Sequence, residues 1–475
     1  MRWQHVAALG IWAIATSPSS ASSRPDAEHS SDVAITHVSV IDAATGTSRV
    51  DQTVTIRGTR IVSVQPSRDT RLPPETRIVD ATGKYLVPGL WDSHVHLSYL
   101  GACALPVFVA NGVTALRDAG ARLDEIREWR HQIAAGQLVG PLIKAAGPNL
   151  ESADWLSRAY RLAPSSDPIW HWGPRLGVDG PGSARGVVDS LARLGVDFVK
   201  FRNLPRATFL AVAREAKRRG LPLAGHAPHG TSILEAADSG MTSIEHAETV
   251  TLALDTASVS LRRRAFAELV KTGAFLTPTL ITERANWLIS DSAHRALIDD
   301  STGTRDPDRK YVSARTIDLW REAMELNRKG DDGSTDWNEL YRRQVADTRL
   351  ADEAGVRFLA GTDVGGAIEL YAGTSLHDEL RLMVRDAGVS PRRALESATT
   401  NPAAFFKLER ERGTIAPGMA ADLVLLDANP LADIDNVRRV RAVVLMGRVL
   451  QRADLDQLLA GVAAQVRARR GCAGS

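Results

Sequence analysis

Two histidines, His94 and His96, stand one residue apart in the apolar segment LWDSHVHLSYL, residues 90–100. If the segment is a β-strand, alternate side chains share one face, so the two imidazoles point the same way. Two imidazoles on one face can chelate a metal ion, but each can equally be satisfied by hydrogen bonds. The spacing alone leaves a metal site and a structural role open.

Four more ionisable residues end short apolar segments in the centre of the chain: Lys200 in DFVKF, His226 in PLAGH, His246 in TSIEH and Asp363 in RFLAGTD. Each has an ordinary alternative role. A lone histidine can be hydrogen-bonded, a lysine can extend its amine to solvent, and an aspartate can cap the next helix. Their shared position, together with the histidine pair, favours one chemical site.

The elements that must position these residues alternate between short apolar strands and amphipathic helices, which predicts an α/β protein with a (β/α)8 TIM-type barrel. In such barrels the active site gathers at the C-terminal ends of the strands. The eight predicted strands end at His96, Asp118, Gly147, Phe201, His226, His246, Thr277 and Asp363.

Both ends of the chain are β-rich, as shown by DVAITHVSVID and QTVTIRGTRIVSVQ near the N-terminus and by ADLVLLDANP and RRVRAVVLMGRVLQ near the C-terminus. Alternation and β-branched residues predict strands, which we expect to form a small composite β-sandwich domain. The predicted divisions are a signal peptide at 1–22, the composite domain at 33–86 plus 413–452, the barrel at 87–412, and a C-terminal helix and tail at 453–475.

Two long connections interrupt the barrel pattern. Residues 148–185 carry Trp155, Trp170, His171 and Trp172, and a loop of this length is typical of a lid or binding loop, although its tryptophans can equally pack it onto the barrel. Residues 281–350 are charged and predicted to be mostly helical.

Composition restricts the partners. The net charge is only +2, with basic residues interspersed among acidic ones, so the chain lacks the basic footprint of a nucleic-acid-binding protein. We therefore expect a small-molecule substrate, and the sequence is compatible with a homo-oligomer. The two cysteines, Cys103 and Cys472, form no disulfide framework; the sequence does not show whether they pair, and we expect that they do not.

The first residues, MRWQHVAALGIWAIATSPSSASS, combine Arg2, a short apolar segment and small residues around Ala21. This pattern is typical of a secretory signal peptide, and the apolar segment is too short to span a membrane. The expected mature protein has no membrane span and is exported, either periplasmic or secreted.

The motifs together resemble the amidohydrolase superfamily. KYLVPGLWDSHVHL, VDFVK, GHAP, SIEHAE and AGTDVGG are similar, in order, to its signatures at strands one, four, five, six and eight. The segment from HDELRLMVRDAG to GTIAPGMAADLVLLDANPL resembles the imidazolonepropionase-like branch, which includes exported metal-dependent Xaa-Pro and Xaa-Arg dipeptidases. The resemblance covers about residues 33–450 and implies the same barrel and composite domain.

The resemblance also implies a binuclear centre. His94, His96 and Asp363 correspond to ligands of the more buried metal, and His226 and His246 to ligands of the second. Lys200 corresponds to the lysine that is carboxylated by carbon dioxide on its side-chain nitrogen and bridges the two ions. Burial favours the neutral amine that this reaction needs. Two divalent ions are expected, with zinc the best match to imidazole ligands.

The implied reaction is hydrolysis of an amide bond in a small substrate such as a dipeptide or an N-acyl amino acid. A metal-bridging hydroxide attacks the carbonyl, and Asp363 acts as the catalytic proton shuttle. Arg202 and His229 are candidate substrate contacts, although Arg202 can equally face solvent and His229 can simply end a turn. His377, at the start of a predicted helix, is interpreted as structural.

Two alternatives remain open from the sequence. One is a lactonase or cyclic-imide hydrolase that uses the same binuclear site. The other is a catalytically inactive relative that serves as a binding protein, which typically has lost ligands; this chain retains all six.

Overall fold

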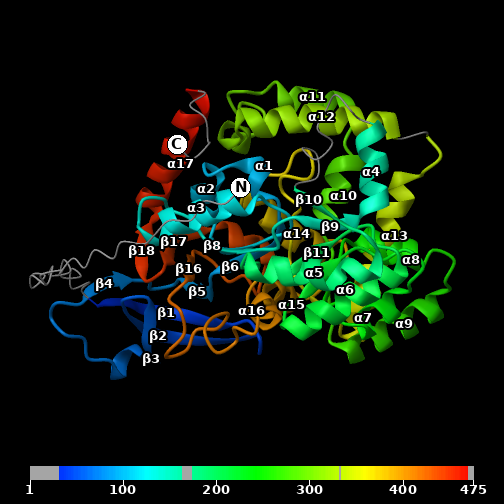
Figure 1. Cartoon of the computed structure of the whole chain (residues 1–475). Coiled ribbons are helices and arrows are strands. Elements are labelled where there is room, and N and C mark those ends of the chain that lie inside the picture. Colours follow the sequence, from blue (N-terminus) through cyan, green and yellow to red (C-terminus); the bar gives the residue numbers. More distant parts are fainter. Residues whose placement is uncertain (1–31, 163–173, 331–332, 469–475) are drawn as a thin grey trace, which may run out of the picture.

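The computed structural model of the protein describes residues 32–162, 174–330 and 333–468 (Figure 1). The predicted signal peptide lies outside the described residues, as do Trp170, His171 and Trp172 of the first long connection. The described chain forms a set of parallel strands surrounded by helices, with a separate eight-stranded β-sheet beside it (Figure 1).

The parallel strands fall into a three-stranded sheet, β6-β7-β8, and a seven-stranded sheet, β10-β9-β11-β12-β13-β14-β15. Short, largely buried strands of this kind are typical of a barrel whose outer face is covered by helices. Their bounds are β6 Leu90–Val95, β7 Val113–Asp118, β8 Leu142–Ala145, β9 Asn149–Ser152, β10 Arg175–Val178, β11 Val199–Phe201, β12 Leu223–Gly225, β13 Ser243–Glu245, β14 Phe275–Thr277 and β15 Arg357–Phe358.

Backbone hydrogen bonds connect the two sheets. Ser93 N donates to Ala360 O at 2.8 Å and His96 N donates to Val364 O at 2.9 Å, which joins β6 to the segment after β15. On the other side, Asp197 N, just before β11, donates to Ala145 O at the end of β8 at 2.9 Å, and β9 pairs with β11. The predicted α/β fold with a TIM-type barrel is confirmed by this parallel arrangement and by its structural relatives, described below.

Two of the predicted strands are less regular than expected. The third, predicted to end at Gly147, forms β8 and ends at Ala145. A separate short strand, β9, begins after Gly147, which has a positive φ of 70°, and Pro148, which has no amide hydrogen to donate. The eighth is reduced to the two residues of β15, and the chain reaches Asp363 in an irregular conformation.

The helices around the barrel follow the predicted periodicity, as α6 illustrates. Its buried residues include Phe209, Val212, Ala213 and Ala216, spaced three and four apart on one face, and it ends at Gly220 in the left-handed conformation. The helices before the second long connection are α1 Leu97–Leu100, α2 Ala104–Ala110, α3 Leu123–Ala134, α4 Ala153–Leu162, α5 Gly180–Arg193, α6 Arg206–Arg219, α7 Ile233–Asp238, α8 Ala247–Ala253 and α9 Val259–Thr272.

The second long connection is helical, as predicted, and lies over one end of the barrel (Figure 1). Its helices are α10 Leu280–Trp287, α11 Asp291–Ile298, the 3-10 helix η2 Pro307–Tyr311, α12 Ala314–Gly330 and α13 Trp337–Ala354. The chain then continues through α14 Thr374–Arg385, α15 Pro391–Ser397 and α16 Thr400–Phe405.

Strands from both ends of the chain share one eight-stranded sheet, ordered β18-β17-β16-β5-β1-β2-β3 with β4 paired to β1. The N- and C-terminal segments meet where β5 and β16 pair antiparallel, with Leu86 opposite Leu425. The bounds are β1 Val33–Asp42, β2 Thr47–Arg57, β3 Arg60–Pro66, β4 Arg77–Asp80, β5 Tyr85–Pro88, β16 Leu423–Leu426, β17 Val440–Leu445 and β18 Arg448–Gln451, with 3-10 helices η1 Ser67–Asp69 and η3 Ile434–Arg438.

The C-terminal helix α17, Arg452–Arg467, begins earlier than predicted and packs against α2, η2, β17 and β18. Cys103 lies at the start of α2, 3.4 Å from the Gln465 side chain of α17, and is disulfide-bonded. The expectation that the cysteines stay unpaired is therefore wrong for Cys103. Cys472 lies outside the described residues.

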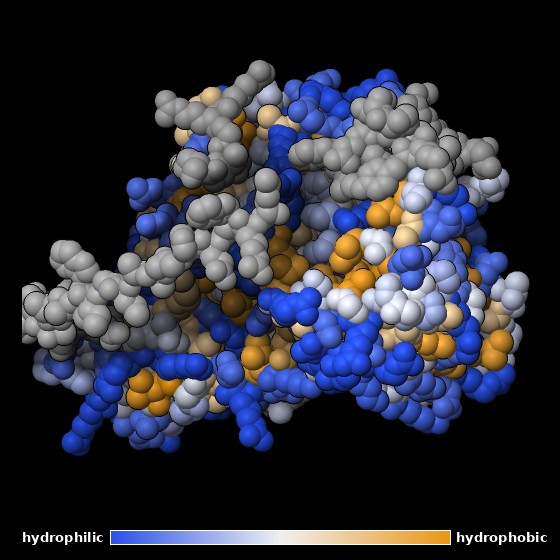
Figure 2. Space-filling view, viewed as in Figure 1, coloured by the Kyte–Doolittle hydropathy of each residue, from blue (hydrophilic) through white to orange (hydrophobic). Residues whose placement is uncertain are grey.

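Hydrophilic residues cover much of the face shown in Figure 2, with hydrophobic groups between them. None of the helices in the described part of the chain is both long and apolar enough to cross a membrane.

Candidate metal centre

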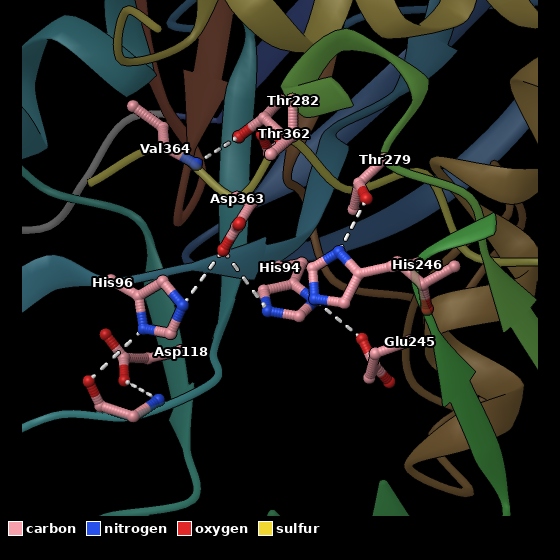
Figure 3. Close-up of polar contacts among 12 residues, drawn as sticks. His94, His96, Asp118, Glu245, His246, Thr279, Thr282, Thr362, Asp363 and Val364 are labelled. Atoms are coloured by element: carbon pink, nitrogen blue, oxygen red, sulfur yellow. Dashed lines mark hydrogen bonds and ion pairs between the residues drawn. The ribbon is translucent and has the colours of Figure 1, made fainter. Parts of the chain in front are cut away.

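The ionisable residues predicted from strand ends lie together around one cavity, and Figure 3 shows four of them: His94, His96, His246 and Asp363. A small cavity of about 50 Å³ is lined by all six predicted ligands. They come from five different strand ends, which the parallel arrangement brings to the same rim: His94, His96, Lys200, His226, His246 and Asp363.

The Asp363 carboxylate lies between the two histidines of the first strand. Its Oδ1 is 2.9 Å from His96 Nε2 and 3.5 Å from His94 Nε2. Ligand atoms of His94, His246 and Asp363 all lie within 4.8 Å of one another, which is compatible with one shared metal ion. Figure 3 shows this convergence.

The remaining histidines continue the cluster. The rings of His226 and His246 are 4.9 Å apart between centroids, and those of His94 and His246 are 4.8 Å apart. Burial lowers the pKa of His246 to about 4 and lowers the pKa values of His94 and His226 well below their usual range. These imidazoles are therefore neutral, which is the form that binds a metal ion.

Hydrogen bonds on the outer ring nitrogens orient the histidines. His94 Nδ1 is 2.6 Å from Glu245 Oε2, and His246 Nδ1 is 2.8 Å from Thr279 Oγ1. In each case the Nε2 atom is left to face the cavity. Metal-bound histidines typically use their second nitrogen in this way, which fixes the tautomer and the ring orientation.

Lys200 has no ordinary partner in this environment. Its side chain is 2% exposed, and its Nζ has no hydrogen-bond partner among the described residues. Burial lowers the pKa of Lys200 to about 8, against the opposing charge of Glu245, while Arg117 adds to the decrease. A buried amine without a partner is costly unless something else satisfies it, so the residues present fit a bound metal pair better than an empty site.

Backbone geometry at two predicted ligands is unusual. His246 has φ 67° and Asp363 has φ 56°, a region that residues other than glycine rarely adopt. The surrounding chain holds both, because His246 N donates to Thr277 O at 2.8 Å and Asp363 N donates to His94 O at 2.7 Å. Such conformations concentrate at functional sites, where they aim side chains that a regular strand would point elsewhere.

The comparisons with known proteins agree with this geometry. The model of the amidohydrolase family matches residues 200–450, more than half of the chain. The protein belongs to the amidohydrolase family. It is therefore a hydrolase that acts on amide or other carbon–nitrogen bonds, in agreement with the resemblance found in the sequence.

Relatives of this amidohydrolase differ in their activities. The dihydroorotase of Anaeromyxobacter dehalogenans is 27% identical over 427 residues, covering 84% of this chain and 89% of that protein. An adenine deaminase of Rubrobacter xylanophilus is 23% identical over 432 residues, covering 86% of this chain, which spans only 56% of that protein. The crystal structure of a Bifidobacterium longum protein described as a prolidase superposes with a TM-score of 0.65 at 25% identity, covering 91% of this chain and 99% of the other.

A second, larger cavity of about 200 Å³ adjoins the candidate metal centre of the amidohydrolase. Arg202, His226, His246, Asp363 and Gly366 line both cavities, so a small substrate held in the larger one can reach the predicted ligands. The other walls of the larger cavity come from α8, α10 and α12. The second long connection thus shapes the substrate site.

The two predicted substrate contacts are placed differently. Arg202 lines both cavities, as expected for a substrate contact. His229 is exposed and lines neither, so the structure adds no support for its predicted role. His377 is 1% exposed and its Nε2 is 2.9 Å from Asn111 O, in agreement with its structural interpretation.

Several polar residues of the amidohydrolase site were missed in the sequence. Glu245 is fully buried and accepts hydrogen bonds from Arg117 Nη2 at 2.7 Å and Ser243 Oγ at 2.5 Å, besides contacting His94. The sequence could have indicated this position for Glu245. Side chains alternate along a strand, so Glu245 and Ser243 lie on the same side of β13, and the carboxylate faces the barrel interior.

Two further residues were also missed. Asp92 is fully buried and accepts from Thr362 N at 3.0 Å and Thr362 Oγ1 at 2.7 Å, which joins the strands carrying His94 and Asp363. Asn149 lines the smaller cavity, and both amide atoms of its side chain lack hydrogen-bond partners within the described residues.

Proposed function

We propose that this amidohydrolase hydrolyses the amide bond of a small substrate, a dipeptide or an N-acyl amino acid, at a centre of two divalent metal ions. The observation that carries the proposal is the six-residue cluster, with the unpartnered Lys200 amine among neutral imidazoles, at the inner end of a cavity of about 200 Å³. A cavity of this size suits a small molecule and excludes a long polymer from the interior.

The proposed ligands divide into two groups. His94, His96 and Asp363 would hold one ion and His226 and His246 the other, with Lys200 bridging them as a carbamate. The neutral amine of Lys200 reacts with carbon dioxide to form this carbamate and releases a proton, a reaction that the lowered pKa of about 8 supports. Zinc is the proposed metal because imidazole ligands predominate, and when bound it supplies an activated water and polarises the scissile carbonyl.

The residues of the chain then handle the proton and the substrate. Burial opposes ionisation of Asp363, but the hydrogen bond from His96 and the neighbouring imidazoles outweigh it and lower the pKa of the carboxyl well below its usual value. The ionised carboxylate accepts the proton of the attacking water and delivers it to the leaving amine nitrogen. Arg202 is proposed to pair with a substrate carboxylate, because it lines both cavities.

The direct test is a hydrolysis screen with the purified, zinc-loaded protein. The panel holds Xaa-Pro and Xaa-Arg dipeptides and N-acyl amino acids, beside lactones and cyclic imides for the alternative reaction. We expect turnover of the linear amides, about two metal ions per chain by elemental analysis, and loss of turnover in Asp363→Asn by about 10²–10⁴-fold. Turnover of lactones or cyclic imides alone would establish the alternative, and a metal-free, inactive protein would refute both.

We also propose that the mature protein is exported, to the periplasm or the medium. The signal-like N-terminus supports this proposal, and so does the disulfide-bonded Cys103, because disulfides persist mainly in oxidising compartments. Fractionation of cells that express the full chain, with N-terminal sequencing of the product, tests it; intact protein confined to the cytoplasm would contradict it.

A further inference from the structure

The larger cavity has an acidic side. Glu283 of α10 and Glu248 of α8 both line it, together with Asn286 of α10. Glu283 is only 6% exposed, and its Oε2 has no hydrogen-bond partner among the described residues; the Oδ1 atom of Asn286 is likewise buried without a partner there. Two oxygen acceptors of cavity-lining residues are therefore buried with nothing in the described chain to donate to them.

The surroundings of Glu283 disfavour its charged form as long as no cation is nearby. Burial raises the pKa of Glu283 well above its usual value, and the neighbouring Glu248 carboxylate raises it further, against hydrogen bonds from Gln344 and Trp287. A buried carboxylate is ordinarily stabilised by a cation or by several donors. Here no lysine or arginine of the described residues forms an ion pair with Glu283.

Aromatic rings complete the surroundings. Trp287 and Trp320 line the same cavity, on α10 and α12. Trp287 stacks on Trp337, with centroids 3.7 Å apart and planes at 3°, and Trp320 packs edge-on against Tyr371 at 5.8 Å. Ring faces attract cations, and rings that are held in place provide this attraction without further ordering.

We propose that Glu283, Glu248 and Asn286, with the two tryptophans, form a subsite for a cationic group of the substrate, an alkylammonium or a guanidinium. This inference rests on the proposed function and narrows its substrate class: the subsite favours a dipeptide with a free amino terminus or a basic side chain over an N-acylated, uncharged amino acid. An ammonium group has three N–H donors. These suffice for the two oxygens that lack partners, Glu283 Oε2 and Asn286 Oδ1, and for the Glu248 carboxylate.

The position of Arg202 agrees with this assignment. Arg202 lines the larger cavity and also the smaller one among the predicted ligands, whereas Glu283 and Asn286 line only the larger one. The cavity therefore presents a cation near the predicted metal ligands and the Glu283 carboxylate farther along its wall, while Glu248 lies within the electrostatic influence of Arg202. A zwitterionic substrate, with opposite charges on either side of an amide, complements this distribution.

The test compares matched substrates that differ in one charge. Free-amino dipeptides are set beside their N-acetyl forms, and lysine-containing dipeptides beside their norleucine counterparts, with wild type, Glu283→Gln and Glu248→Gln. Glu268→Gln is the control, because Glu268 is exposed on α9 and its ion pair within the described chain is with Lys271 at the surface. Circular dichroism and metal content verify that each variant is folded and loaded.

For the wild type we expect at least a tenfold higher kcat/KM for the charged member of at least one pair, and which pair shows it identifies the amino terminus or the side chain as the group bound. Glu283→Gln should remove most of this preference, mainly by raising the KM of the charged substrate. The uncharged substrate should keep a rate within about threefold of its wild-type value. Glu248→Gln should also reduce the preference for the charged substrate. Wild-type rates that ignore the charge, or variants that slow both members equally, would overturn the subsite.

A binding measurement separates failure of this inference from failure of the proposed function. Calorimetry with n-butylammonium, and with 1-butanol as its uncharged control, tests the subsite without any reaction. If no amide is hydrolysed but n-butylammonium binds the wild type and not Glu283→Gln, the proposed function is wrong and the subsite stands. If neither ligand binds and no charge preference is found, the subsite is wrong.

Discussion

Lys200 is the residue whose chemistry most directly tests the centre, because its amine is buried and has no hydrogen-bond partner within the described chain. Lys200→Ala removes the proposed bridge. We expect metal content to fall and kcat/KM to decrease by at least about 100-fold, in line with losses seen when metal-site contacts are removed. Added acetate or propionate should restore part of the activity, because a small carboxylate can occupy the space of the carbamate.

The matched control is Lys217→Ala, since Lys217 is exposed on α6. It should keep the metal content and rate of the wild type. Full metal loading and normal turnover of Lys200→Ala without any added acid would show that Lys200 does not bridge metals.

Gly366 illustrates how closely the predicted ligands are packed. A Cβ atom at this position would lie 2.9–3.0 Å from the carboxylate atoms of Asp363, closer than such contacts normally come. Gly366→Ala should therefore displace Asp363, with at least a tenfold loss of kcat and of metal affinity, measured by steady-state kinetics and by competition with a chelator.

Gly186→Ala provides the contrasting case. Gly186 lies within α5, and a Cβ there would meet no atom within 4 Å. Alanine should stabilise this helix by about 0.5–1 kcal/mol without changing the rate. If Gly366→Ala behaved in the same way as Gly186→Ala, the Asp363 carboxylate would not be held as tightly as the structure indicates.

At the scale of elements, α10 connects the barrel to the substrate cavity, since it carries Glu283 and Trp287. Its first turn is held by Glu379 of α14, whose carboxylate accepts from Leu280 N at 3.1 Å and Ile281 N at 2.8 Å. Glu379 is fully buried, so it takes the place of the solvent or side-chain cap that a helix N-terminus needs.

Glu379→Ala leaves these two buried amides without acceptors. We expect the free energy of unfolding to fall by about 1–3 kcal/mol and KM to rise more than kcat falls, because the cavity wall shifts while the metal ligands stay in place. Thermal unfolding and steady-state kinetics measure both effects. Glu268→Ala, a surface change on α9, should leave Tm and KM nearly unchanged, and an unchanged KM in Glu379→Ala would show that α10 is positioned by other contacts.

At the scale of the whole molecule, neutral buried imidazoles make stability depend on pH. His377 lies outside both cavities, and burial together with the nearby Arg438 and Arg381 lowers its pKa to about 3, despite the hydrogen bond to Asn111. Between about pH 6.5 and pH 3 the unfolded chain binds a proton that the folded chain does not. Stability from this group is therefore complete above pH 6.5 and is lost as the pH falls toward 3.

His377→Gln tests this prediction, because glutamine can still donate to the Asn111 carbonyl but cannot take up the proton. From pH 7 to pH 5 the wild type should lose about 2 kcal/mol more than the variant, or about 2 °C in Tm for a chain of this size. Differential scanning calorimetry at both pH values measures the difference. Equal decreases would mean that His377 is already protonated in the folded protein.

The disulfide at Cys103 adds a second property of the whole chain. Cys103 lies at the start of α2, where that helix contacts α17, and it lines neither cavity. Cys103→Ser should lower Tm by a few degrees, corresponding to about 2–4 kcal/mol, and leave kcat/KM nearly unchanged because the bond is remote from the cavities. Thiol titration of the unreduced, denatured wild type should find no free cysteine; a full thiol signal would contradict the disulfide.

The sequence by itself determined the barrel and the six clustered residues. Apolar strands alternate with amphipathic helices, and parallel strands must end at the same rim, so His94 and Asp363 could be expected to meet although 268 positions separate them. The order of the motifs also indicated the family, and the resemblance to that family gave the predicted assignment of each residue to a metal ion. Strand alternation would also have shown Glu245 facing the interior.

The tertiary structure decided what surrounds that cluster. Asn149 lines the smaller cavity from β9, a strand that was not predicted, and Glu379 reaches α10 through packing of α14 against it. In the sequence, Glu283 belongs to a charged helical segment with no sign of burial. The burial of its side chain depends on how α10 and α12 pack over the barrel. Spacing along a chain reports which residues share a strand end or a helix face, whereas the contacts between separate helices depend on how their side chains pack.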